Sequence, residues 1–141
     1  MQKVFFHSAD RTLSVKGKAK IKDIILSIFS QEKVSLERLD YIFCSDEYLL
    51  GINRKFLKHD YYTDIITFEL SESDGIKGEI YISTDSVKDN AASIKITFRE
   101  EVARVIFHGA LHLCGYKDKK KKEIELMRSK EDYYIKLLHS K

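Results

Sequence analysis

The chain has 141 residues, 43% of them hydrophobic and 33% charged, which fits one globular domain whose core needs neither disulfides nor a structural metal. Its net charge of +3 permits an anionic partner without requiring one. Two separated cysteines, Cys44 and Cys114, indicate reduced core thiols and exclude a disulfide framework. Since no stretch resembles a secretory signal or a membrane span, we expect a soluble, cytoplasmic protein.

The first half of the chain predicts two strands and two helices. In chain order they are a strand at 4–7, a helix from 18 to about 33, a strand at 39–44 and a helix over 46–58. The first helix shows apolar residues at steps of three and four, the pattern of an amphipathic helix. Asp46 is placed to cap the second.

The second half begins with strands at 64–70 and 77–83, joined by a hairpin-like Ser-Glu-Ser-Asp-Gly loop. Helices follow from 83 or 84 to about 94, from 98 to 113, and over a last segment that contains Ile124 and Leu138. The elements mix without strict βαβ alternation. We therefore predict an α+β fold, a mixed four-stranded sheet covered by about five helices.

The segment 108–118, HGALHLCGYKD, carries the most chemical information. His108 and His112 are four residues apart, so on a helix both imidazoles project from one face. Gly115 can take the left-handed conformation that ends a helix, after which the chain can bring Asp118 to a third position. Two histidines and one carboxylate leave an open coordination position, as a catalytic zinc requires.

The spacing H-x-x-x-H-x-x-G-x-x-D is close to that of extended metalloprotease signatures, which place a glutamate base directly after the first histidine. Here Gly109 takes that place and can transfer no proton. The pair could instead be two ordinary core or surface imidazoles. Two buried imidazoles without partners are costly in an apolar stretch, however, and a metal removes that cost.

The same segment resembles the H-G-x-L-H-L-x-G-Y-D-H signature of the YbeY family, metal-dependent endoribonucleases that mature bacterial ribosomal RNA. Upstream, Asn53 and the segments TDIITF (63–68), GEI (78–80) and Asn90-Ala91 also fall in the family's order. The resemblance covers residues 46 to 118. It implies that residues 1–141 form a single YbeY-like metallohydrolase domain with one Zn²⁺ held by His108, His112 and Asp118.

The resemblance further implies single-strand-specific cleavage of RNA in the maturation of the 16S rRNA 3' end and in ribosome quality control. The expected partners are ribosomal RNA and the ribosome, with no membrane and no DNA. Three alternatives stay open: a peptidase-like zinc hydrolase, an iron oxygenase with a two-histidine, one-carboxylate triad, and a ribosome-associated RNA-binding protein with a structural metal.

Two positions depart from the family pattern. The third ligand is a histidine in the family and Asp118 here, and the family arginine thought to contact phosphate is Leu57 here. The charge of the missing arginine could come from the neighbouring cations Arg54, Lys55 and Lys58 or from the five lysines of 117–122, or these side chains could simply be solvated. Glu79 could support a ligand histidine or be an edge-strand charge.

Overall fold

Four strands form one mixed sheet in the order β1-β2-β4-β3 in the computed structural model, which describes residues 2–71 and 74–140. The strands are β1 (Val4–Ser8), β2 (Leu36–Cys44), β3 (Ile65–Glu69) and β4 (Ile76–Ser83). β1, β2 and β4 run parallel, and β3 pairs antiparallel with β4. The predicted β3–β4 pairing is confirmed, although residues 72 and 73 of the connecting loop lie outside the described residues.

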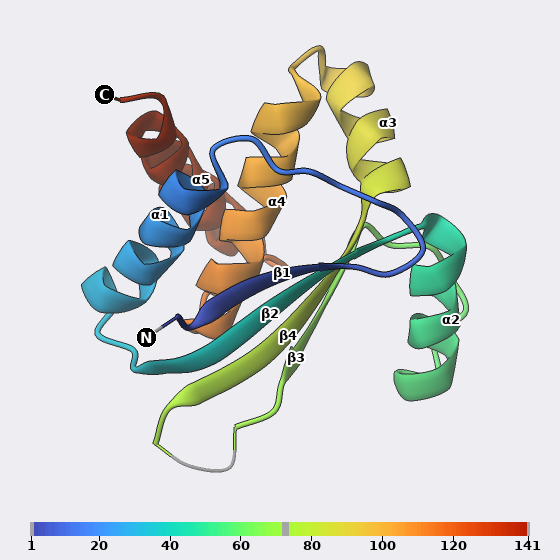
Figure 1. The fold of residues 1–141 in the computed structure, drawn as a ribbon, viewed down its shortest axis with the longest axis horizontal. Helices are drawn as coiled ribbons and strands as arrows, with labels where there is room; N and C mark the ends of the chain where they lie inside the picture. Colours follow the sequence, from blue (N-terminus) through green and yellow to red (C-terminus); the bar gives the residue numbers. More distant parts are fainter. Residues whose placement is uncertain (1, 72–73, 141) are drawn as a thin grey trace.

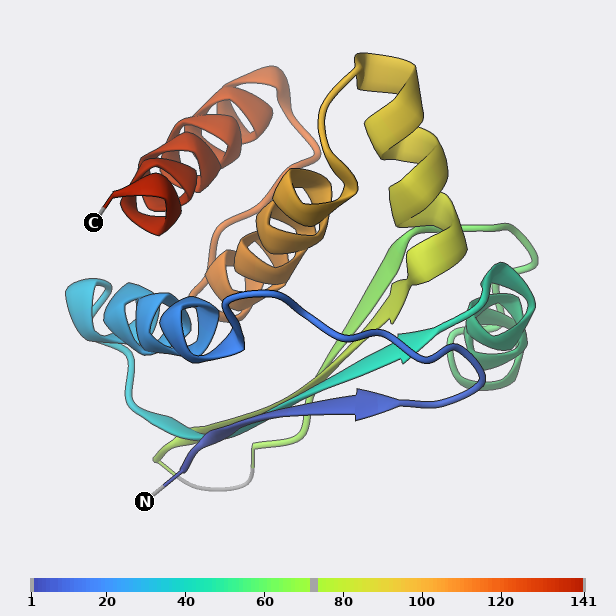
Figure 2. The ribbon, with the colours of Figure 1, turned by 45° about the horizontal axis from the view of Figure 1, so that its top comes forward.

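Five helices complete the α+β fold predicted from the sequence: α1 (Lys18–Gln31), α2 (Asp46–Phe56), α3 (Thr84–Ile94), α4 (Phe98–Leu113) and α5 (Lys121–His139). Helices α1, α4 and α5 lie over one face of the sheet, whereas α2 lies at its other side (Figures 1 and 2). None of the helices in the described part of the chain is both long and apolar enough to cross a membrane.

Alternation along β2 decides which helices cover which face. Leu39, Tyr41 and Phe43 are buried in the main core, and the Tyr41 hydroxyl donates to the carbonyl oxygen of Ile106 in α4 at 2.8 Å. Cys44, the next residue after Phe43, packs in a second cluster with Leu49 of α2 and Ile66 of β3. At its C-terminal end β2 is therefore covered on both faces. Cys44 and Cys114 are free thiols, as predicted.

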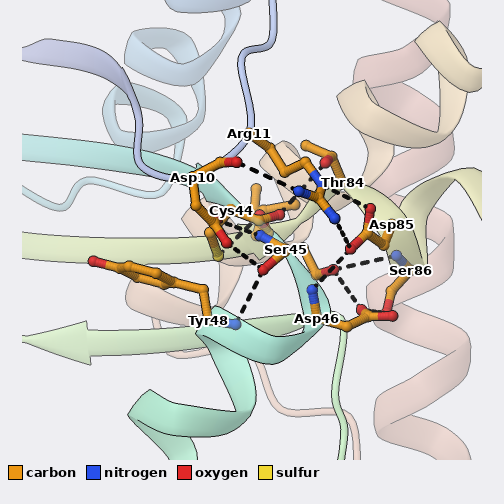
Figure 3. A network of polar contacts seen from close by, with 11 residues as sticks. Asp10, Arg11, Cys44, Ser45, Asp46, Tyr48, Thr84, Asp85 and Ser86 are labelled. Atoms are coloured by element: carbon orange, nitrogen blue, oxygen red, sulfur yellow. Dashed lines mark hydrogen bonds and ion pairs between the residues drawn. The ribbon is translucent and has the colours of Figure 1, made fainter.

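A polar network fixes the starts of α2 and α3 where the parallel strands end (Figure 3). The Ser45 hydroxyl accepts from the backbone N–H of Tyr48 and so caps α2, which corrects the expectation that Asp46 is the cap. Asp46 instead accepts from the hydroxyls of Ser83 and Ser86, and its backbone N–H donates to Asp85. The two helices are thereby held to each other.

Helix α4 approaches the sheet closely at a glycine. A Cβ atom at Gly109 would lie 2.8 Å from Cδ1 of Ile80 on β4 and 3.2 Å from Cδ1 of Ile65 on β3. The side of α4 that carries Gly109 is thus packed against the sheet. This packing determines the orientation of the helix and so determines which of its residues reach the opposite side.

Candidate functional site

One side of α4 forms the floor of a cleft of about 690 Å³. Glu101, Val105, His108 and His112 line it, at the spacing of one helix face. The loop between α2 and β3 and the start of β3 form one wall, and the α4–α5 turn with Arg128 of α5 forms the other. The wall residues are Asn53, Leu57, His59, Tyr61, Thr63, Asp64, Ile65, Ile66, Thr67, Asp118, Lys119 and Arg128.

His108 is held between two carboxylates. Its Nδ1 lies 2.7 Å from Oε2 of Glu131, and its Nε2 lies 3.2 Å from Oδ2 of Asp118. Burial by itself would lower the pKa of His108, but the hydrogen bond to Glu131 and the charges of Glu131 and Asp118 raise it above the ordinary value. The two carboxylates thus favour a positive charge, either a proton or a metal ion, on the side of the His108 ring that faces Asp118.

His112 shows a defined tautomer. Its Nδ1 lies 2.6 Å from the carbonyl oxygen of Tyr116, which can only accept, so Nδ1 donates, and in the neutral ring Nε2 carries the lone pair. The contact forms because Gly115, with φ 106°, reverses the chain directly after α4. This confirms the predicted glycine turn. The ring centroids of His108 and His112 are 5.7 Å apart, so the turn leaves two imidazoles side by side.

The three candidate metal ligands are only partly assembled. His108 contacts Asp118, and its ring neighbours that of His112. Within residues 2–71 and 74–140, however, no group of three or more His, Cys, Asp or Glu side chains is arranged to hold a metal ion. The donor set nevertheless suits a metal ion. A neutral His108 that donates from Nδ1 to Glu131 turns the lone pair of Nε2 toward Asp118, which is also an acceptor, and a cation between them would satisfy both.

Glu131 is a site residue that sequence reasoning missed. It is only 5% exposed, and besides His108 it accepts from Arg104 Nη1 at 3.2 Å, while Arg104 also pairs with Asp132 at 2.9 Å. The signal was present in the sequence, because Glu131 interrupts the buried stripe of α5 between Met127 and Tyr134. A charged residue on the apolar side of an amphipathic helix requires a buried partner.

Two further carboxyl groups line the cleft: Asp64, which belongs to the TDIITF segment that matches the family, and Glu101, which the sequence did not single out. Glu101 is 7% exposed, and its Oε1 atom has no hydrogen-bond partner among the described residues. Burial raises the pKa of Glu101 and also that of Asp64. Two desolvated carboxyl groups in the lining, of which Asp64 interacts electrostatically with His108, make the cleft favourable for a cation or a proton.

Most of the cations proposed from the sequence, and the carboxylate, lie elsewhere. Arg54 pairs with Asp60, and neither it nor Lys55 or Lys58 lines the cleft. From the lysine run 117–122, however, Lys119 does line the cleft, together with Arg128, which the sequence did not single out. Glu79 interacts with the Tyr81 hydroxyl on the sheet face opposite to Ile80, away from α4, and its strand β4 is central, not an edge. The carboxylate that supports a histidine is Glu131.

Two neighbouring histidines in a carboxylate-lined cleft are donor groups of the kind that metal-dependent enzymes use. A family model described as Endoribonuclease YbeY matches residues 5–139, so the chain belongs to the YbeY family. The protein named Endoribonuclease YbeY of Cytophaga hutchinsonii is 53% identical over 135 residues, covering 95% of this chain and 94% of that protein.

Two other matches span nearly the whole chain. The Endoribonuclease YbeY of Porphyromonas gingivalis is 40% identical over 138 residues, covering 98% of this chain and 91% of its own length. The solution structure of a Thermotoga maritima protein aligns with a TM-score of 0.65 and 29% identity, over 94% of this chain and 86% of that one. The family assignment therefore rests on sequence similarity along nearly the whole chain, of which the 108–118 motif is one part.

Proposed function

We propose that this chain is a metal-dependent endoribonuclease that hydrolyses single-stranded RNA during ribosomal RNA maturation, with residues 1–141 as one such domain. The observation that carries the proposal is the arrangement around His108. With Nδ1 hydrogen-bonded to Glu131, the ring directs Nε2 at Asp118, while the adjacent His112 keeps its Nε2 lone pair. Membership of the YbeY family supplies the RNA substrate and the role in ribosomal RNA maturation.

The residues that would hold the metal are His108, His112 and Asp118. Two imidazole nitrogens and one carboxylate oxygen with an open position are the donor set of a catalytic zinc, so Zn²⁺ is the proposed ion. When bound, such an ion supplies Lewis-acid polarisation of a phosphodiester oxygen. Glu131 and the Tyr116 carbonyl orient the two rings through Nδ1, which leaves both Nε2 atoms available on one side.

The cleft walls account for how the substrate is held. Lys119 and Arg128 place positive charge on the α5 side, where the phosphates of an RNA strand would lie. Gly109 has its Cβ position filled by Ile80, so the glutamate base of a metallopeptidase has no room there. We place the protein in the cytoplasm, associated with ribosomal RNA and the ribosome rather than with DNA or a membrane.

The test is cleavage of end-labelled single-stranded RNA by the purified protein, with and without EDTA and with Zn²⁺ restored. We expect chelation and His112→Ala each to abolish cleavage, because each removes the metal or one of its proposed ligands. His112 lies on the exposed rim of the cleft, so its replacement should leave the fold intact. The matched control is His139→Ala at the exposed end of α5. Metal analysis of the protein as isolated distinguishes zinc from iron. Cleavage that survives replacement of both His108 and His112 would refute the proposal.

A further inference from the structure

The cleft has two chemically different walls. The α5 side carries Lys119 and Arg128, whereas the opposite loop between α2 and β3 carries the rings of His59 and Tyr61. A single RNA strand has the same division, because its phosphates lie along one side and its unstacked bases project from the other. The two walls therefore match the two sides of one strand in their chemistry.

His59 and Tyr61 form a stacked pair. Their ring centroids are 5.1 Å apart at an interplanar angle of 21°, and the Tyr61 hydroxyl lies 2.9 Å from Nδ1 of His59. Tyr61 is 55% exposed, so a large part of its ring is open to the cleft. An exposed aromatic ring that is already ordered is the type of surface on which proteins stack a base of single-stranded nucleic acid.

Asn53 holds both residues of the pair. This side chain is 1% exposed and its Nδ2 donates to the carbonyl oxygen of Tyr61 at 2.9 Å. The backbone carbonyl oxygen of Asn53 accepts from the backbone N–H of His59 at 3.1 Å, just beyond the C-terminal end of α2. The backbone of both residues is thus anchored to the end of a helix, and the contact between the Tyr61 hydroxyl and His59 Nδ1 holds the two rings to each other. Fixing them in advance lowers the entropy lost on binding, which favours a binding role over an incidental surface pair.

We infer that the His59–Tyr61 pair is a stacking platform for one nucleobase of a single-stranded RNA whose neighbouring phosphates face Lys119 and Arg128. The inference deepens the proposed function and rests on it for the ligand class. All four bases present an aromatic face, so the platform binds without a strong sequence preference. Where the family arginine is replaced by Leu57, stacking on this wall adds affinity that charge does not supply there.

Binding measurements in EDTA separate stacking from cleavage. The ligands are an oligoadenylate and an abasic ribose-phosphate oligomer of equal length, which has the same charges and no bases. We expect Tyr61→Ala to weaken oligoadenylate binding about tenfold or more, the range of one lost base stack, and to leave abasic binding unchanged. Tyr61→Phe keeps the ring and should stay near wild type. Tyr62→Ala is the matched control, because Tyr62 is 58% exposed but hydrogen-bonded to Glu47 outside the cleft lining.

A fluorescence measurement gives a direct readout. The chain has no tryptophan, so Tyr61→Trp places the one tryptophan of the variant on the platform, where it can be excited selectively over the remaining tyrosines. Its emission should be quenched by oligoadenylate and unaffected by the abasic oligomer. Equal losses for both ligands in Tyr61→Ala, or an unquenched tryptophan while binding persists, would overturn the platform and leave the nuclease proposal standing. Quenching by a protein that cleaves no RNA when loaded with Zn²⁺ would support the platform and refute the nuclease proposal instead.

Discussion

Replacing Glu131 with glutamine tests how the His108 ring is held. The carboxylate accepts from His108 Nδ1 through one oxygen and from Arg104 through the other. An amide of the same shape has only one acceptor. If its oxygen faces His108, its NH₂ group meets the Arg104 donor; if its oxygen faces Arg104, its NH₂ group meets His108 and forces the proton onto Nε2. Both orientations lose one of the two bonds, and the second also removes the lone pair facing Asp118.

Two quantities should change by different amounts. A hydrogen bond to a charged group in a buried setting contributes about 1.5–3 kcal/mol, and Arg104 keeps its second partner, Asp132, at 2.9 Å. We therefore expect the free energy of unfolding of metal-free Glu131→Gln to fall by about 2 kcal/mol. Partners that orient a ligand histidine typically change metal affinity by about 10- to 100-fold, so Zn²⁺ binding should weaken within that range.

The assay combines urea unfolding, Zn²⁺ calorimetry and ¹⁵N chemical shifts of the histidine rings, recorded above the titration of His108. The wild type should show His108 protonated at Nδ1, and the variant should show a mixture or the opposite tautomer. Glu125→Gln, on the exposed side of α5, is the control for losing one charge from the helix. Unchanged Zn²⁺ affinity and tautomer in a destabilised Glu131→Gln would show that Glu131 only stabilises the fold.

Three other predictions concern the packing, the polar network and the cationic wall. Gly109→Ala places a methyl group 2.8 Å from Ile80 and should lower the free energy of unfolding by about 1–3 kcal/mol. Gly51 lies within α2 with open space around its Cβ position, so Gly51→Ala should raise the free energy of unfolding by about 0.5–1 kcal/mol. Equal melting temperatures of the two variants would contradict the packing argument. The hydrogen bond from the backbone N–H of Asp46, and then the Arg11 guanidinium, lower the pKa of Asp85 in the folded protein. The contribution of Asp85 to the free energy of unfolding is therefore fully present above its pKa in the unfolded chain, near 3.9, and is lost as the pH falls through its lower pKa in the folded protein. Asp85→Asn should therefore destabilise the protein at neutral pH and have no effect in strong acid, and a loss that is independent of pH would exclude this cause. Arg128→Gln should reduce the slope of log affinity for RNA against log salt by about 0.7, and an unaltered slope would remove Arg128 from the phosphate path.

The sequence predicted those parts of the fold and site that depend on local pattern. Helix α4 begins and ends where its apolar spacing indicated, and its histidine pair and Gly115 turn followed from the same stretch. β2 begins three residues before its predicted start, since Leu36 is buried and pairs with β4 after an irregularity in register. Such a pairing depends on the neighbouring strand, which the local pattern of β2 does not encode.

The parts that were missed arise from contacts between distant segments. Glu131 lies 23 residues after His108 and approaches it only because α5 packs along α4. The stacked pair at 59 and 61 depends on Asn53 reaching both backbone groups, whereas the motif comparison identified Asn53 only as a matching letter. In each case the sequence contained the residue, but its role required the position of a second element.

Gly109 shows how one residue links the fold to the chemistry. His108 and His112 face the cleft, and the next position after His108 is turned about 100° around the helix, where it meets Ile80 and Ile65 of the sheet. A carboxylate base at that position would be buried in the core, away from any substrate. The packing of α4 therefore leaves no space at this position for the glutamate of a peptidase. Carboxyl groups that can take part in proton transfer must then come from other positions in the cleft, and Glu101 and Asp64, whose pKa values burial raises, already lie there.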